Sequence, residues 1–569
     1  MTSAGPFVLL DDARGGGEAW LYAGPTEIVA THEPAEIRAC LERLRGRHAA
    51  GFLSYEAGLA LEDRLAPRAE TPSPDAPPLL WFGMFDRAER VDPAALLPDG
   101  SGAWASRPRP LIAEADYRAA IDAVLAHIAA GDIYQANLTF QAEARIAGDP
   151  RALYATIRKR ARAGHGGIVF TGDHWLLSFS PELFFTCDGG HVVTRPMKGT
   201  APAGSDPAAL RDDPKQRAEN LMIVDLLRND LSRLARPGTV KVPEMFAVET
   251  YPTVLQMTST VTAELEQGAG PVDLLAAIHP CGSVTGAPKI RAMEIIHTLE
   301  KGPRGVYTGA IGRFAPDGAA AFNVAIRTLV IKAGETRARL GLGSGIVADS
   351  RAGPEWRECL TKGEFLATTR RFDLIETMAF DPHAGIAELD RHLARLKRSA
   401  EALDFPFDRH EARNELQAAT FRAGPSIVRL LLSPSGAMAI ELRAPPPALD
   451  GPVRAAIADL PVPAEDFRLR HKTSDRAFYD HARASAGTLE VLFRDSAGFL
   501  TEGSFTSLFV ERDGALLTPP LSRGLLPGIL RERLIEEGRA READLTEADL
   551  ADGFLIGNAV RGLIPAVCA

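Results

Sequence analysis

The sequence predicts an α+β protein with more than one domain. Strand-like apolar runs follow one another without the regular helix–strand alternation of a βαβ fold. At 569 residues the chain is too long for one ordinary core, and its length corresponds to roughly three or four domains. The pattern changes near residue 371, which predicts two unrelated units, 1–370 and 371–569.

Composition places the chain among average globular proteins, with 46% hydrophobic and 24% charged residues. The 64 basic residues are outnumbered by 74 acidic ones, so no basic field indicates nucleic-acid binding. Five scattered cysteines without metal-ligand spacing favour reduced thiols. No basic segment followed by a long apolar run resembles a signal peptide, and no stretch reaches the ~18–20 apolar residues of a membrane span. We therefore expect a cytoplasmic protein without a membrane partner.

In the first unit, short strands are expected at 51–58 and 79–86. Apolar residues at helical spacing predict a helix over 114–132, which Gly131 ends, and a second helix over 212–235 with Pro214 near its start. Further strands are expected at "GIVFTG", "WLLSFS", "LFFTCDGG", "HVVTRP", "GAIGRF", "AFNVAIRTLVIKAG" and "RARLGLGSGIVA".

The second unit begins with a strand, "RFDLIETMAF". An amphipathic helix over 389–405 and a hairpin, "SIVRLLLSPSGAMAIELRAP", follow it. The proline-rich stretch 444–452 then separates this subdomain from a strand-and-helix remainder.

Polar residues in the first unit suggest a site for a small polyanion. Glu355, Glu358 and Lys362 share a helix face, and two facing carboxylates suit Mg²⁺; the alternative is a solvated acidic surface. Arg327 and Tyr307 are candidate carboxylate binders. The glycines of "GLGSG" lack a complete dinucleotide fingerprint and are better explained by close approach of a ligand.

One lysine lies in an unusual setting. In "RPMKGTAP" the Pro-Met and Gly-Thr flanks predict a tight, rigid, non-helical corner around Lys198. A loop lysine is usually solvated. A rigid corner would instead aim an amine at a ligand with little loss of entropy.

A series of short motifs occurs in order over about 240 residues of the first unit. The motifs are "GDIYQANLT", "SPELF", "TRPMKGTAP", "AENLMIVDLLRNDLSR", "HPCGSVTGAPKIRAMEII", "YTGAIG", "NVAIRT" and "GSGIVADS" with "EWRE". Together they resemble the chorismate-utilising enzymes, a family that includes anthranilate, aminodeoxychorismate, isochorismate and salicylate synthases. The resemblance implies a sandwich of large antiparallel sheets with helices outside and Mg²⁺-dependent chorismate binding in a central cleft.

This resemblance also implies residue roles. Glu219 and Glu358 would bind Mg²⁺ directly and Glu355 through water, whereas Gln216 replaces an acid that many relatives carry. Glu182 would be the general acid that protonates the departing C4 hydroxyl, a role that needs a raised pKa. The expected substrate contacts are Gln135, Thr200, Gly286, Ala287, Lys289, Tyr307, Arg327, Gly345 and Lys362.

Two positions are expected to select the reaction. Family members that add water carry lysine where this chain has Gln135, which disfavours isochorismate and salicylate synthesis. Anthranilate synthases typically carry alanine at the position of Lys198, and the lysine form is typical of aminodeoxychorismate synthases. There the lysine, when neutral, is thought to attack C2 of chorismate.

The second unit combines a lysine, an acid and a Gly/Pro turn that opens a helix. Lys472 ends an extended run, Glu502 lies where a turn enters a strand, and the Gly/Pro turn of "GLLPGILRERL" opens a helix whose N–H groups suit a phosphate. Asn558 and Arg395 add polar groups. Taken alone, each feature can be explained as an ordinary surface residue or helix cap without a bound ligand.

Together these features resemble the fold-type IV pyridoxal-phosphate enzymes, which include aminotransferases and 4-amino-4-deoxychorismate lyase. Lys472 would hold the cofactor and Glu502 would protonate its ring nitrogen. Arg395, Ile529, Leu530 and Asn558 would hold the phosphate. Local motifs do not separate lyase from transaminase, but fusion to the first unit favours the lyase.

We therefore expect synthesis of 4-aminobenzoate for folate. No glutamine amidotransferase motif is found, so ammonia would come from a separate glutaminase or from free ammonium. A homodimer through the second unit is expected from the resemblance. The alternatives are an anthranilate synthase fused to an aminotransferase, and a second unit that only binds cofactor or mediates oligomerisation.

Overall fold

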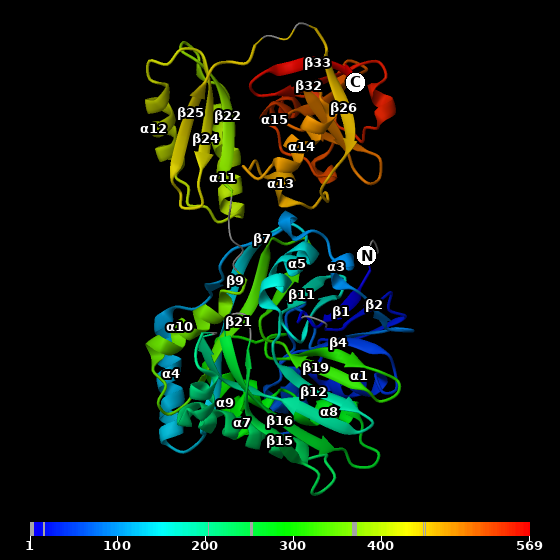
Figure 1. Ribbon diagram of the computed structural model, residues 1–569, viewed down its shortest axis with the longest axis vertical. Coiled ribbons are helices and arrows are strands. Elements are labelled where there is room, and N and C mark those ends of the chain that lie inside the picture. Colours follow the sequence, from blue (N-terminus) through cyan, green and yellow to red (C-terminus); the bar gives the residue numbers. More distant parts are fainter. Residues whose placement is uncertain are drawn as a thin grey trace. The chain divides into compact units, whose positions relative to one another are not determined.

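The computed structural model describes residues 5–14, 17–202, 204–250, 254–366, 372–447, 449 and 451–569. The chain divides into two compact units (Figure 1). The first comprises 1–100, 107–144 and 154–367, and the second comprises 101–106, 145–153 and 368–569. The predicted boundary at 370/371 lies outside the described residues.

Two large sheets form the first unit, and their described strand pairs are antiparallel. One sheet has eleven described strands: β17 (Gly286–Ala287), β9 (Gln135–Ala147), β21 (Arg337–Ile346), β20 (Thr328–Lys332), β11 (His174–Ser178), β10 (Gly166–Phe170), β1 (Phe7–Asp11), β2 (Ala19–Ala23) and β6 (Glu89–Arg90) in spatial order, with β7 (Trp104–Ala105) and β8 (Arg109–Pro110) beside β9.

The other sheet has ten described strands. Their spatial order is β14 (Met197–Pro202), β16 (Val254–Glu264), β13 (His191–Arg195), β12 (Leu183–Asp188), β19 (Ala320–Val324), β18 (Ala310–Phe314), β4 (Ala49–Leu53), β5 (Leu80–Met84) and β3 (Glu27–Thr31), with β15 (Lys241–Thr250) beside β16.

A shared core joins the two sheets face to face. Val8 and Leu176 of the first sheet pack in one buried cluster with Phe52 and Ile311 of the second. This is the two-sheet sandwich that the sequence predicted. The outer face of the second sheet carries its own apolar core, to which Phe185, Phe322 and helical residues such as Ile223 contribute.

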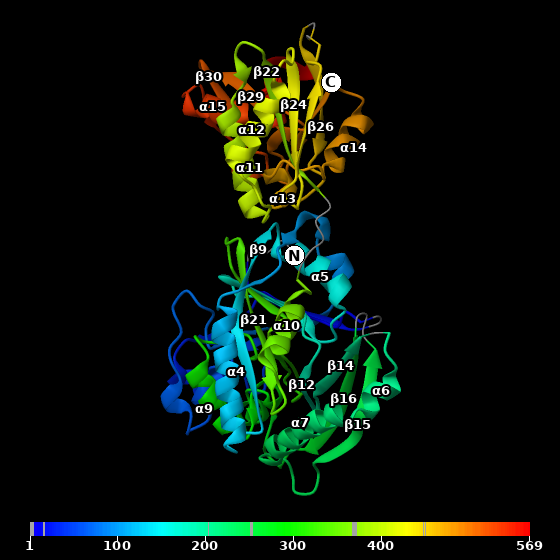
Figure 2. The same ribbon diagram turned by 90° about the vertical axis from the view of Figure 1, so that its left-hand side faces the viewer.

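Helices cover the outside of the sandwich. Figures 1 and 2 show α4 and α10 side by side, and both contact β21, whereas α7 packs on β14 and β16. The helices of this part are α1 (Ile37–Arg43), α2 (Ala57–Leu61), α3 (Pro93–Leu96), α4 (Glu114–Ala129), α5 (Pro150–Ala161), α6 (Pro207–Asp212), α7 (Pro214–Ser232), α8 (Pro271–Ile278), α9 (Lys289–Leu299) and α10 (Ala352–Gly363).

The second unit contains two further sheets, one of four and one of eight described strands. The small antiparallel sheet is β23 (Gly385–Ile386), β22 (Leu374–Asp381), β24 (Ser426–Leu432) and β25 (Met438–Arg443). The larger, mixed sheet is β28 (Leu500–Gly503), β27 (Glu490–Arg494), β26 (Val453–Asp459), β33 (Gly562–Cys568), β32 (Phe554–Asn558), β29 (Ser507–Arg512), β30 (Ala515–Thr518) and β31 (Ala540–Glu542). Its helices are α11 (Leu389–Ala402), α12 (Arg409–Thr420), α13 (Phe467–Arg470), α14 (Ala477–Ala486) and α15 (Ile529–Glu536).

Most predicted elements are confirmed, with two corrections. The strand expected over 51–58 ends at Leu53, and the chain then enters α2. The long strand expected from "AFNVAIRTLVIKAG" is two strands, because Arg327 adopts a positive φ of 50° between them. Across the described residues, no helix combines the length and apolar character needed to cross a membrane.

Candidate active sites

Lys198 lies in a distorted strand and not in the tight corner that the sequence predicted. It belongs to β14, which pairs with β16, and the pairing register shifts between Met197 and Thr200. Gly199 within this irregularity has a φ of 94°, which glycine adopts without strain. The bulge supplies the rigidity expected of a turn while the strand continues.

The Lys198 amine lies among groups from three other elements. A β-carbon at residue 345 would lie 3.7 Å from Lys198 Nζ and 3.0 Å from Gln135 Nε2, so Gly345 leaves room where these side chains converge. The Asn220 side chain of α7 donates to the Lys198 carbonyl at 3.3 Å. Burial lowers the pKa of Lys198, although the charge of Glu182 opposes this shift. A lowered pKa is what a nucleophilic amine requires.

Glu182 is buried next to this cluster, with 6% of its surface exposed. Burial raises the pKa of its carboxyl group, and the Ser283 hydroxyl and the Lys198 charge work against this shift. Its Oε1 is a buried oxygen without a hydrogen-bond partner among the described residues. A buried carboxyl group with a raised pKa and one oxygen free of hydrogen bonds to the described residues suits a general acid.

The predicted metal ligands come from two helices, Glu219 from α7 and Glu355 and Glu358 from α10. The charge of Glu358 adds to the burial that raises the pKa of Glu219. Each of these two carboxylates lies near a lysine. The distance from Lys362 Nζ to Glu358 Oε1 is 2.8 Å, and that from Lys215 Nζ to Glu219 Oε1 is 4.0 Å. No group of three or more His, Cys, Asp or Glu residues in the described ranges is arranged to hold a metal, so the Mg²⁺ site stays a prediction.

The other expected substrate contacts have varied surroundings. The buried Tyr307 ring packs against residue 341, where a β-carbon would lie 1.9 Å from the ring and only glycine fits. Gly286 and Ala287 form β17 against Ala136 and Gln135, next to the Lys198 cluster.

Two expected contacts are engaged elsewhere. The Lys289 ammonium lies 3.0 Å from the buried Asp230 and 2.6 Å from the Ile278 carbonyl. The Thr200 hydroxyl donates to Gln256 Oε1 at 3.0 Å. We therefore infer that the Lys289 side chain anchors the start of α9 to Asp230 and to the Ile278 carbonyl. A substrate role for this side chain stays a prediction.

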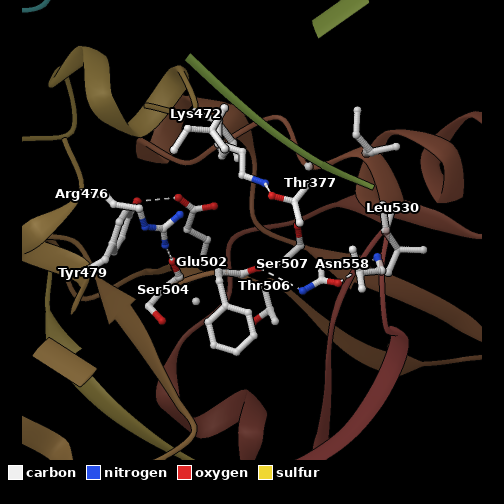
Figure 3. A pocket seen from close by; sticks show the side chains of 18 of the residues that line it. Thr377, Lys472, Arg476, Tyr479, Glu502, Ser504, Thr506, Ser507, Leu530 and Asn558 are labelled. Atoms are coloured by element: carbon white, nitrogen blue, oxygen red, sulfur yellow. Dashed lines mark hydrogen bonds between the residues drawn. The ribbon is translucent and has the colours of Figure 1, made fainter. Parts of the chain in front are cut away.

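The second unit holds a cavity of about 450 Å³ lined by Lys472, Glu502 and Asn558 (Figure 3). Lys472 Nζ donates to Thr377 Oγ1 of β22 at 3.2 Å. Burial lowers the pKa of Lys472 to about 7, and the charge of Arg395 adds to this effect. The amine is therefore largely neutral just above neutral pH, as an imine-forming lysine requires.

Glu502 lies in the same cavity and is bound by Tyr479, whose hydroxyl donates to Oε1 at 2.7 Å (Figure 3). Burial raises the pKa of Glu502 to about 8. A buried carboxyl group in this setting suits a contact with a ring nitrogen, because the two groups can share one proton.

The expected phosphate pocket is partly preformed. The helix α15 starts after Gly528 without a side-chain cap, and Ile529 and Leu530 at its start line the cavity. A β-carbon at residue 528 would lie 2.5 Å from Ser507 Oγ, so a larger residue there would displace the Ser507 hydroxyl. This uncapped, close-fitting helix start fits a bound phosphate.

Arg395 and Asn558 are more committed than the sequence suggested. Arg395 is buried and binds both oxygens of Glu376 at 2.9 and 2.7 Å, and it also donates to the Pro527 carbonyl at 3.1 Å. Asn558 accepts from the N–H groups of Val560 and Arg561 at 3.0 Å. Both residues therefore hold the loops around the helix start, and their direct contact with a phosphate stays a prediction.

Sequence reasoning missed several neighbours of the key residues. Thr377 and Asn220 contact Lys472 and Lys198 but lie far from them in the sequence. Arg476 and Tyr479 lie four and seven residues after Lys472 in "KTSDRAFYD". This spacing at the start of α14 could have indicated that the three side chains lie close together. Ser283 lies beside Glu182 with no signal of its own.

Glu502→Gln is expected to stabilise protein freed of bound small molecules at high pH. The pKa of Glu502 is about 4.5 in the unfolded protein but about 8 in the folded protein. The contribution of Glu502 to the free energy of unfolding is therefore lost as the pH rises between these values. The free energy of unfolding of the variant should exceed that of the wild type by roughly 5 kcal/mol at pH 9, and the difference should shrink toward pH 5. Urea unfolding at both pH values measures this. Asp480→Asn, at an exposed cavity residue, is the control, and a pH-independent difference would contradict the expectation.

Two family models match the chain in the order of its two units. The model for chorismate binding enzymes matches residues 6–368. The model for class IV amino-transferases matches residues 373–567.

Individual relatives match part of the first unit. Aminodeoxychorismate synthase component 1 of Escherichia coli K12 is 42% identical over 243 residues, which are 42% of this chain and 53% of the relative. Anthranilate synthase component 1 of Thermus thermophilus is 42% identical over 258 residues, 44% of this chain and 55% of the relative. The chain thus spans about half the length of the curated relatives it matches.

A solved structure, anthranilate synthase component I from Streptococcus pneumoniae TIGR4, superposes with a TM-score of 0.55 at 25% identity. The match covers 62% of this chain and 92% of the other. The likeness in fold therefore covers more than half of this chain.

Proposed function

The chain belongs to the chorismate binding enzymes and carries a class IV aminotransferase domain behind that unit, and on this premise we propose that it converts chorismate to 4-aminobenzoate in two steps. The first unit aminates chorismate to 4-amino-4-deoxychorismate. The second removes pyruvate from that intermediate. The observation that carries the proposal is Lys198, a partly buried amine with a lowered pKa beside Gln135 and Glu182.

In the first step Lys198 Nζ attacks C2 of chorismate while the C4–O bond breaks. Glu182 gives its proton to the departing hydroxyl, which leaves as water. Ammonia then adds at C4, and the bond between C2 and Lys198 breaks. Gln135 is a neutral neighbour that cannot activate water as a lysine would, which favours amination over hydration.

Magnesium is the cation that suits this carboxylate set. Glu219 and Glu358 would hold it, with Glu355 acting through water. Its charge would neutralise a substrate carboxylate and release Lys362 from Glu358. Tyr307 and Arg327 would bind the substrate beside it.

In the second step the side chains of the cavity act on 4-amino-4-deoxychorismate. Pyridoxal phosphate, when bound, supplies an electron sink for the carbon that bears the substrate amine. Lys472 would hold the cofactor, and its amine would take the C4 proton of the substrate. Glu502 would keep the ring nitrogen protonated, and the start of α15 would bind the phosphate. Loss of pyruvate then makes the ring aromatic.

Ammonia would reach the first unit from a separate glutaminase subunit. The names of relatives such as aminodeoxychorismate synthase component 1 support a two-component arrangement. A homodimer through the second unit is a further part of the proposal, as it is common among fold-type IV enzymes.

Chorismate, ammonium and Mg²⁺ are expected to yield 4-aminobenzoate and pyruvate in equal amounts with the purified chain loaded with pyridoxal phosphate. Chromatography of the products measures this. Anthranilate is the competing product, because anthranilate synthases match the chain as closely. Anthranilate without 4-aminobenzoate would contradict the proposal, whereas accumulation of 4-amino-4-deoxychorismate without pyruvate would favour a non-catalytic second unit.

A further inference from the structure

The cavity of the second unit has a large excess of positive charge. Among the described residues, seven arginines and Lys472 line it, against two carboxylates, Asp480 and Glu502. Which of these cations remain for a ligand depends on how many are already paired with carboxylates of the cavity walls.

Internal ion pairs account for four of the seven arginines. Arg395 pairs with Glu376, Arg443 with Glu441, Arg468 with Asp466 and Arg483 with Asp480. These pairs stabilise the walls of the cavity, so their guanidinium groups are already compensated. Arg429, Arg476 and Arg561 remain.

Arg429 lies next to the reactive lysine on the small sheet. In the register of β22 and β24 it stands directly opposite Thr377, the residue that binds Lys472 Nζ. Directly opposed side chains of an antiparallel pair lie on the same face. Glu441 approaches Arg429 only at 4.0 Å and already pairs with Arg443. Arg429 thus keeps most of its charge for the cavity.

Arg476 approaches the same lysine from the opposite wall. It precedes α14, four residues after Lys472, and donates to the Ser504 carbonyl (Figure 3). Its guanidinium lies 5.4 Å from the Tyr479 ring centroid. Within the described ranges, no carboxylate lies within 4.0 Å of it. Arg561, by contrast, donates to the Pro447 carbonyl on a different loop.

We propose that Arg429 and Arg476 each bind one carboxylate of an amine substrate and so make the second unit selective for dicarboxylates. The proposal deepens the lyase function proposed above and rests on it. A guanidinium binds a carboxylate through two parallel hydrogen bonds. An amine substrate with an apolar side chain would leave both arginines partly desolvated without a partner, which is unfavourable.

Competing anions of matched shape test this inference. Isophthalate carries two carboxylates on a benzene ring and benzoate carries one. Their binding is followed through the visible absorbance of pyridoxal phosphate in the full-length holoenzyme, which reports on this cavity and not on the first unit. Wild type should bind isophthalate at least about 10-fold more tightly than benzoate.

Arg429→Gln and Arg476→Gln should each reduce that preference by about 10-fold, and Arg429→Lys and Arg476→Lys should reduce it less. Arg483→Gln removes a compensated arginine of the same cavity and should leave the preference unchanged. An unchanged preference in both glutamine variants would overturn the proposal, as would an equal loss in Arg483→Gln. The amount of bound pyridoxal phosphate shows whether each variant is folded. If a glutamine variant does not fold, the corresponding lysine variant is used to test the preference instead.

The outcome separates this inference from the proposed function. A holoenzyme that shows the isophthalate preference but releases no pyruvate from 4-amino-4-deoxychorismate would remove the lyase function and leave the dicarboxylate site. A holoenzyme that releases pyruvate, with a preference that neither arginine variant changes, would remove the site and leave the function.

Discussion

Lys198→Ala is expected to reduce the formation of 4-amino-4-deoxychorismate by about 1,000-fold or more, because it removes the proposed nucleophile. The measurement is chorismate consumption with ammonium and Mg²⁺. Pyruvate release from supplied 4-amino-4-deoxychorismate should stay at the wild-type rate. Lys198 belongs to the first unit, whereas the cavity around Lys472 is built within the second.

Two further variants separate nucleophilic attack from a simple charge effect. Lys198→Arg keeps the positive charge beside Glu182 but offers no neutral amine, so it should be as inactive as Lys198→Ala. Lys215→Ala removes an exposed lysine of α7 that pairs with Asp349, and it should retain most activity. Substantial amination by Lys198→Arg would show that charge, not attack at C2, is what residue 198 provides.

The sequence carried enough information for the fold class, because regular patterns specify regular elements. The helical spacing of apolar residues over 114–132 corresponds to α4. The proline near the start of 212–235 occupies the first position of α7, where Asp213 caps the helix. The bulge at Lys198 could not be predicted, because it depends on pairing with β16 some 60 residues later. Pairing register is a tertiary property that local residue preferences do not encode.

The candidate sites show the same division. Lys198, Glu182, Lys472 and Glu502 were identified because each lies within a recognisable motif. Their partners Thr377 and Asn220 were missed, since a lone threonine or asparagine in an element has no distinguishing spacing. The resemblance assigned Arg395 to a phosphate, and that role stays a prediction, whereas its ion pair with Glu376 of β22 had no signal in the sequence.

Lys472→Ala is expected to abolish pyruvate release from 4-amino-4-deoxychorismate, by about 1,000-fold or more, and to remove the visible absorbance of covalently held pyridoxal phosphate. Both effects follow from loss of one amine, whose lowered pKa of about 7 keeps it reactive near neutral pH. Chorismate consumption should continue at the wild-type rate, and the amino intermediate should accumulate.

Thr377→Val tests whether the surroundings of Lys472 contribute beyond the amine itself. It removes the hydroxyl that accepts from Lys472 Nζ at 3.2 Å but keeps the size of the side chain, so it should slow pyruvate release by about 10-fold or less and retain the absorbance.

A mixture of Lys198→Ala and Lys472→Ala protein compares the two active sites directly. Each variant keeps the active site that the other lacks, so the mixture should restore 4-aminobenzoate formation that neither shows alone. Activity of Lys472→Ala on the supplied intermediate would mean that another group moves the C4 proton, and the assignment of Lys472 would then be wrong.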